Sequence, residues 1–116
     1  WVRKAADQGF APAQSNLGVL YRNGDGVTRD DAQAAAWYQK AAQQGNAVAQ
    51  YNLACCYEDG IGVPKDLIEA FRLYALAEKN GDRVAQVGLK LVKTKMKSAQ
   101  IAEAERRVSA PATPVP

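Results

Sequence analysis

The sequence of 116 residues contains no histidine, two cysteines and one methionine. Without histidine the chain lacks the commonest general base and the commonest metal ligand, which excludes a histidine-dependent catalytic triad. The cysteines are adjacent, at Cys55 and Cys56, and a disulfide between neighbours in one helix would break that helix. We therefore expect free thiols, no enzymatic activity, no metal and no cofactor.

Long apolar runs are also missing, because none approaches the roughly 18 residues that suggest a membrane span. The net charge of +3 is unevenly placed: residues 1–82 carry eight basic and ten acidic side chains, and residues 83–116 carry seven and two. The lysines of the basic end have no interleaved aromatic residues on which bases could stack. We interpret them as a solvated helix face and expect no nucleic acid partner. These lysines are Lys90, Lys93, Lys95 and Lys97.

The feature that organises the chain is an internal repeat of 36 residues. Residues 37–72 match residues 1–36 at 17 of 36 positions, and a third copy begins at Leu73 before it degenerates. A fixed period of this length predicts a solenoid of stacked helix pairs. The matched positions include Trp1/Trp37, Ala5/Ala41, Gly9/Gly45, Ala13/Ala49, Gln14/Gln50, Leu17/Leu53, Tyr21/Tyr57, Gly24/Gly60, Gly26/Gly62, Val27/Val63 and Asp30/Asp66.

Local signals divide each copy into two helices. The glycines that recur at the same phase suit the left-handed residue after a helix, and each loop G-x-G-V permits a tight reversal. Asp30 with Gln33, and Asp66 with Glu69, fit a capping box, while Asn46 and Asp82 fit N-caps. We expect helices at 1–8, 11–23, 31–44, 47–58, 67–80 and 83–93. Their inward residues are predicted to include Ala34, Trp37, Tyr38 and Ala41, and Ala70, Phe71, Tyr74 and Ala77.

The third copy loses the G-x-G-V loop, so we expect a break near Thr94–Ser98, with Ser98 as an N-cap, and a last helix at about 99–108. The organisation predicted is residues 1–10 as the second helix of a truncated repeat, repeats at 11–46 and 47–82, degenerate capping helices at 83–108, and a disordered proline-rich tail at 109–116. Because Trp1 enters the repeat partway through, we expect a fragment of a longer array.

The pattern K-A-A-x-Q-G…A-x-A-Q…N-L…Y…G-x-G-V…D resembles the Sel-one-like repeat, a relative of the tetratricopeptide repeat, over roughly residues 1–92. The segment M-K-S-A-Q-I-A-E-A-E-R-R is similar to the terminal helix of bacterial members. The resemblance implies an all-α, right-handed α/α superhelical solenoid whose first helices line a concave side. It also implies an adaptor that binds a protein or peptide, in the periplasm, outside the cell or in the cytoplasm.

Carrying the tetratricopeptide concave positions over by phase marks one face on each first helix. Tyr51 is the best single candidate, because tyrosine supplies a large contact area at low entropic cost. The alternative is that Tyr51 packs on Ser15 or on the neighbouring helix. The candidates for partner binding are Ser15, Val19, Arg22, Tyr51, Cys55 and Glu58. The same phase includes Pro12, Asn23, Val48, Asp59, Val84, Val87, Leu91, Thr94 and Lys95.

Two further expectations bear on these sites. The final helix is expected to fold back over Val84, Val87 and Leu91 as a cap, and Cys56 takes the phase of Leu20 and should be a small core residue. Other functions left open are a purely structural cap of a longer array and a cell-envelope protein that binds β-lactams. The regular cysteine pairs of the β-lactam-binding members are absent.

Overall fold

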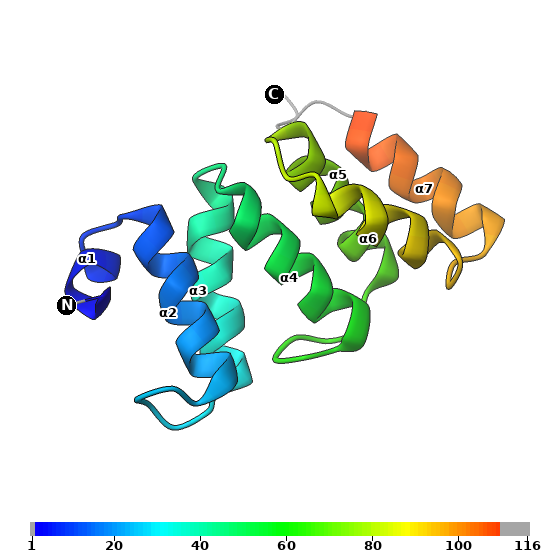
Figure 1. Cartoon of the computed structure of the whole chain (residues 1–116). Helices are drawn as coiled ribbons and strands as arrows, with labels where there is room; N and C mark the ends of the chain where they lie inside the picture. Colours follow the sequence, from blue (N-terminus) through cyan, green and yellow to red (C-terminus); the bar gives the residue numbers. More distant parts are fainter. Residues whose placement is uncertain (1, 110–116) are drawn as a thin grey trace, which may run out of the picture.

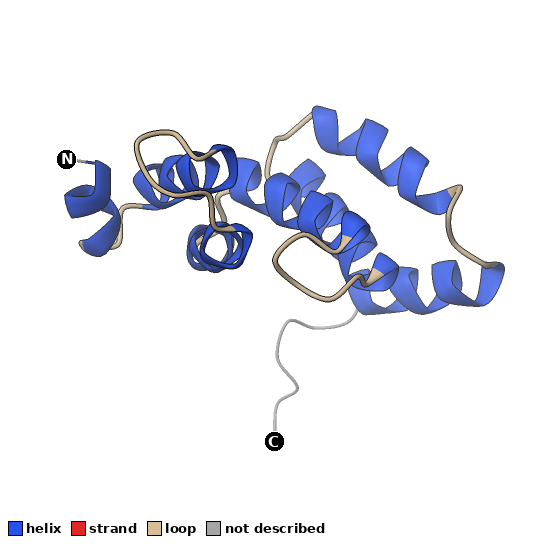
Figure 2. Ribbon diagram, turned by 90° about the horizontal axis from the view of Figure 1, so that it is seen from below, coloured by secondary structure: helices blue, strands red, loops and turns tan. Residues whose placement is uncertain are grey.

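The computed structural model describes residues 2–109, and within that range it contains helices and no strands (Figures 1 and 2). Consecutive helices run in opposite directions and stack side by side along the molecule (Figure 1). The architecture is the all-α helical-repeat solenoid predicted from the sequence. Its helices are α1 (Val2–Asp7), α2 (Ala11–Asn23), α3 (Asp31–Gln43), α4 (Ala47–Asp59), α5 (Leu67–Lys79), α6 (Val84–Lys93) and α7 (Ser98–Ser109).

Side-chain caps begin the helices as predicted. The carboxylates of Asp30 and Asp66 accept the backbone N–H three residues on, at 3.1 and 3.0 Å, and the Asn46 amide oxygen does the same at 2.8 Å. The reciprocal half of the predicted capping box is only partly present: Gln33 Nε2 reaches back to Asp30 Oδ2 at 3.2 Å, whereas Glu69 bonds Arg72, and neither side chain bonds the aspartate backbone. The backbone N–H of each aspartate instead donates to the carbonyl of a tyrosine in the preceding helix, Tyr21 or Tyr57, at 2.9 Å. The G-x-G-V loops are thus tied back to the helix they leave.

Both G-x-G-V loops lie at the same edge of the stack, the lower edge in Figure 1. Gly62, in the second loop, has a φ of 73° and lies so close to α3 that a Cβ would collide with the Asp31 carbonyl oxygen. Gly26, at the same phase in the first loop, has a φ of 72° but no atom within 4 Å of a Cβ position. One glycine of the motif therefore serves only backbone conformation, and the other also serves contact between repeats.

The core confirms the inward residues expected on α3 and α5, all of which are buried, together with Leu17 and Leu53. Next to the core, the side chains of two glutamines link neighbouring repeats by hydrogen bonds. Gln14 Nε2 donates to the Ala6 carbonyl at 3.2 Å, and Gln50 Nε2 donates to the Ala42 carbonyl at 3.1 Å. Each of these glutamines also accepts an N–H at its Oε1, from Gln44 Nε2 at 2.8 Å or from Asn80 Nδ2 at 2.9 Å. The third glutamine of this phase, Gln86, is exposed.

The last two helices depart from the regular pattern. The expected N-cap at Asp82 is displaced by one residue, because Arg83 is the N-cap of α6, but Asp82 Oδ1 still accepts the N–H groups of Val84 and Ala85 at 2.9 and 3.3 Å. The expected N-cap at Ser98 is wrong, because Ser98 is already the first residue of α7. The helix therefore begins one residue earlier than expected, and the backbone N–H of Lys97, just before it, donates to Gln100 Oε1 at 2.8 Å. Helix α7 packs against α5 and extends to Ser109, the first residue of the predicted tail. The rest of that tail lies outside the described residues.

Candidate partner-binding face

The first helices of the successive pairs, α2, α4 and α6, present equivalent positions side by side, because they run parallel and are related by the 36-residue repeat. We call the surface that carries these equivalent positions the first-helix face. By phase it comprises Pro12, Ser15, Val19 and Arg22 of α2, then Val48, Tyr51, Cys55 and Glu58 of α4, and finally Val84, Val87 and Leu91 of α6 with Lys95 just after that helix.

Several large apolar side chains are exposed together on this face, and monomeric proteins rarely expose such groups of apolar residues. Val84, Val87 and Leu91 of α6 are 56, 57 and 56% exposed, and Val19 and Val48 are also exposed. The expectation that the final helix covers the α6 residues is wrong. Helix α7 packs on α5 instead, because its buried residue Ala104 contributes to the core on that side. The apolar row of α6 is therefore open.

At the centre of the face, a tyrosine pair joins α4 to α5. The rings of Tyr51 and Tyr74 lie 5.7 Å apart between centroids and are tilted by 59°, a favourable aromatic geometry. Tyr51 thus packs on a neighbouring helix, as the alternative interpretation foresaw, but it remains half-buried and keeps part of its ring at the surface. The Cys55 thiol and burial together raise the pKa of Tyr51, so its hydroxyl stays protonated near neutral pH.

The hydroxyl of Tyr74 lies at the centre of a cluster of polar side chains next to this pair. It donates to Glu58 Oε1 at 2.6 Å and lies 3.4 Å from Cys55 Sγ, so the thiol is the donor in that contact. Lys95 Nζ donates to Glu58 Oε2 at 2.6 Å. Burial would raise the pKa of Glu58, but the hydrogen bonds from Lys95 and Tyr74 outweigh burial and lower it. The cluster therefore fixes α4, α5 and the end of α6 around an ionised carboxylate.

The six predicted residues accordingly have different environments. Tyr51, Cys55 and Glu58 come together around Tyr74, which sequence reasoning had placed only in the core. The Glu58 side chain is 12% exposed and already paired, so its role on the face is structural. Ser15 of α2 is 4% exposed and offers almost no surface to a partner, whereas Val19 is exposed and Arg22 half-buried.

Neither cysteine makes a disulfide, as expected. Cys56 is fully buried, and burial raises the pKa of its thiol to about 11. A thiol that stays protonated inside the core is a poor nucleophile. Among the described residues there is also no group of three or more potential metal-ligating side chains, and none of their helices combines the length and apolar character needed to cross a bilayer.

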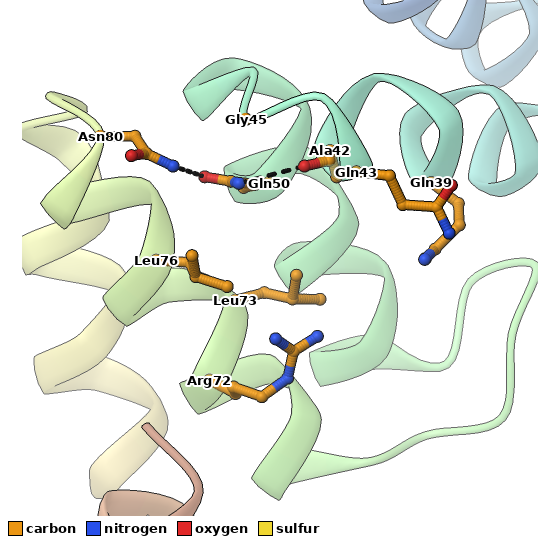
Figure 3. Close-up of a pocket in the computed structure, with 9 residues that line it drawn as sticks. All are labelled: Gln39, Ala42, Gln43, Gly45, Gln50, Arg72, Leu73, Leu76 and Asn80. Carbon is orange, nitrogen blue, oxygen red and sulfur yellow. Dashed lines mark hydrogen bonds between the residues drawn. The ribbon is translucent and has the colours of Figure 1, made fainter. Parts of the chain in front are cut away.

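A groove lies on the opposite side of the molecule, between α3 and α5 (Figure 3). It measures about 720 Å³ and contains none of the six predicted residues. Sequence reasoning missed it, although one signal was available: the repeat has Trp37 on α3 but Leu73 at the same phase on α5. Its lining consists of Gln39, Ala42, Gln43, Gly45, Gln50, Arg72, Leu73, Leu76 and Asn80.

The family model for the Sel1 repeat matches residues 1–10, 11–46 and 47–82. The chain belongs to the Sel1 repeat family. Sel1 repeats are in general protein-interaction scaffolds, typically without enzymatic activity. No curated protein sequence is significantly similar to the chain.

Two solved structures of Sel1-like repeat proteins resemble the chain. A protective antigen present in uropathogenic Escherichia coli strains, which displays an SLR fold, superposes with a TM-score of 0.89 at 36% identity over 93% of this chain. The chain spans 23% of the length of that antigen. A Sel1 repeat protein from Oxalobacter formigenes superposes with a TM-score of 0.76 at 42% identity, covering 78% of this chain and 68% of the other. The Sel1 repeats seen here thus match bacterial relatives in both sequence and fold.

Proposed function

We propose that this Sel1 repeat chain binds a protein or peptide segment on its first-helix face and acts as an adaptor. The observation that carries the proposal is the open apolar row of α6, continued on α4 by Val48 and on α2 by Val19. A monomeric surface rarely leaves several large apolar side chains aligned in this way unless something covers them. The membership of the Sel1 family supports a binding function over a catalytic one.

The side chains at the centre of the first-helix face are held in place by their neighbours, which suits binding by a preformed surface. Tyr51 is held against Tyr74, and Glu58 is held by Tyr74 and Lys95, so the side chains at the centre have little conformational freedom left to lose. Preorganised contacts lower the entropic cost of association. The face would bind through the apolar row of α6, with Tyr51 and Val48 as the adjoining surface and Arg22 at its edge.

The experiment compares capture of partners from cell extract by the wild type, by Val87→Asp and by Val108→Asp. Both substitutions place a carboxylate on an exposed valine, but Val108 lies on α7, away from the face. We expect a protein that is retained by the wild type and by Val108→Asp and lost with Val87→Asp. A photo-crosslinking residue at Leu91 should then attach to that same protein. Capture that survives Val87→Asp would refute the proposal.

A further inference from the structure

The groove between α3 and α5 shares no residue with the first-helix face. Its floor is apolar, with buried Leu73 and Ala42 and half-buried Leu76, while amide side chains from Gln39, Gln43 and others surround it (Figure 3). Its volume of about 720 Å³ lies in the range of ligand sites.

The repeat itself shows what fits this position. One junction earlier, Trp37 of α3 has the phase of Leu73, and its indole ring is 8% exposed and lies near Arg3 of α1. Two cations cover that ring: Arg3 Cζ lies 5.7 Å from its centroid and Lys40 Nζ lies 4.5 Å from it. Cations over an aromatic face stabilise the ring electrostatically. An aromatic side chain of the chain itself therefore lies at the earlier junction, next to two cations.

At the α3/α5 junction each of these three residues is replaced by its counterpart of the next repeat. Leu73 stands for Trp37, Gln39 for Arg3 and Leu76 for Lys40. Because leucine is smaller than tryptophan, Leu73 leaves space at this position. Because uncharged residues replace both cations, the centre of the groove carries no charge. One cation has been added: Arg72 stands where the earlier repeat has Ala36, and it lines the groove. Its guanidinium is held by Glu69 through bonds of 2.8 and 2.7 Å.

We infer that the groove between α3 and α5 receives an aromatic side chain, above all tryptophan, from a segment of a partner protein. The ring takes the place that Trp37 takes in the preceding repeat and rests on Leu73 and Leu76. The negative face of an aromatic ring complements the positive guanidinium of Arg72 at the edge of the groove. Because the groove exceeds the size of one ring, residues flanking the aromatic residue also enter it, where Gln39 and Gln43 can hydrogen-bond to their backbone.

The test uses the isotope-labelled full chain and two probes, N-acetyltryptophanamide and N-acetylleucinamide. We expect the tryptophan probe to shift the side-chain amide signals of Gln39 and Gln43 at millimolar concentration, and the leucine probe to produce shifts several-fold smaller. Leu73→Trp fills the groove from within and should abolish the shifts. Val87→Asp, on the first-helix face, should leave them unchanged. A variant combining Gln39→Arg, Leu73→Trp and Leu76→Lys rebuilds the α1/α3 arrangement and should also be closed.

Gln43→Trp provides a variant at an exposed position, in case Leu73→Trp does not fold. Its indole lies beside the groove and should compete with the probe, reducing the shifts at Gln39 several-fold. The inference is overturned if neither probe shifts these signals, if the leucine probe acts as strongly as the tryptophan probe, or if the shifts persist in the folded filled variants. Because Val87→Asp alters the first-helix face and not the groove, failure of this inference can be distinguished from failure of the proposed function.

Discussion

Gln50 and Gln86 occupy the same phase of the repeat, but only Gln50 is built into the interior, and this difference yields a quantitative prediction. Gln50 is buried and makes two side-chain hydrogen bonds, to the Ala42 carbonyl and from the Asn80 amide. Gln86 is exposed and makes no side-chain hydrogen bond to another described residue. Substituting each by alanine therefore removes the same atoms from two different environments.

The expected cost for Gln50→Ala follows from its contacts. Each lost hydrogen bond costs about 1 kcal/mol. The Ala42 carbonyl keeps a partner in the variant, because it also accepts the backbone N–H of Gly45 at 3.0 Å. The higher helix propensity of alanine returns only a few tenths of a kcal/mol. We expect the free energy of unfolding to fall by about 2 kcal/mol. Gln86→Ala loses no such bond, so its effect should stay within about 0.5 kcal/mol.

The assay is urea denaturation followed by circular dichroism, with the three proteins at the same concentration. A small domain has a denaturant slope of about 1–2 kcal/mol/M in urea. Gln50→Ala should therefore lower the midpoint by at least about 1 M, while Gln86→Ala should leave it nearly unchanged. Equal midpoints for the two variants would show that the buried glutamine bonds contribute nothing net to stability and would refute the reasoning.

Three further predictions concern other parts of the molecule. Gly62→Ala should destabilise the fold by at least about 1–3 kcal/mol more than Gly26→Ala, because both pay for a left-handed alanine but only the first collides with backbone; equal unfolding midpoints would contradict this. The lowered pKa of Glu58 means that its stabilisation is complete above its usual value of 4.5 and is lost as the pH falls through the lower folded-state value. The unfolding midpoint of the wild type should therefore drop more steeply on acidification below that value than the midpoint of Glu58→Gln, whereas parallel pH profiles would argue against it. In a Cys55→Ser variant, the Cys56 thiol should react with a disulfide reagent at pH 8 only after urea is added, since burial raises its pKa to about 11; rapid reaction of the folded protein would show that Cys56 is accessible.

The repeat period, the helix bounds and the caps follow from the sequence because they depend on local interactions. Asp30, Asp66 and Asn46 each satisfy a backbone N–H only three residues away, so their role can be predicted without any knowledge of distant contacts. The same holds for the glycines that end the helices. Where the expected capping box failed, a longer-range contact was responsible: the backbone of each aspartate bonds to the end of the preceding helix instead.

The candidate binding face was predictable only in outline. Phase alone placed Tyr51, Cys55 and Glu58 on one side of α4, but phase cannot say that Tyr74 reaches from α5 to bond both Cys55 and Glu58. That contact depends on how the two helices are rotated against each other. Ser15 shows the opposite outcome, since it has the right phase and yet is buried.

By itself the sequence determined a Sel1 repeat solenoid, its helices and the side on which the first helices present their equivalent residues, since all of these repeat with the chain and are encoded within a few turns. Tertiary structure alone decided that α7 packs on α5, which leaves the apolar row of α6 open. It also decided that Leu73 lines a groove, whereas Trp37, at the same phase, is buried with its ring near two cations. Both depend on lateral packing between helices of different repeats, where the size of one side chain determines whether a surface is closed or available for binding.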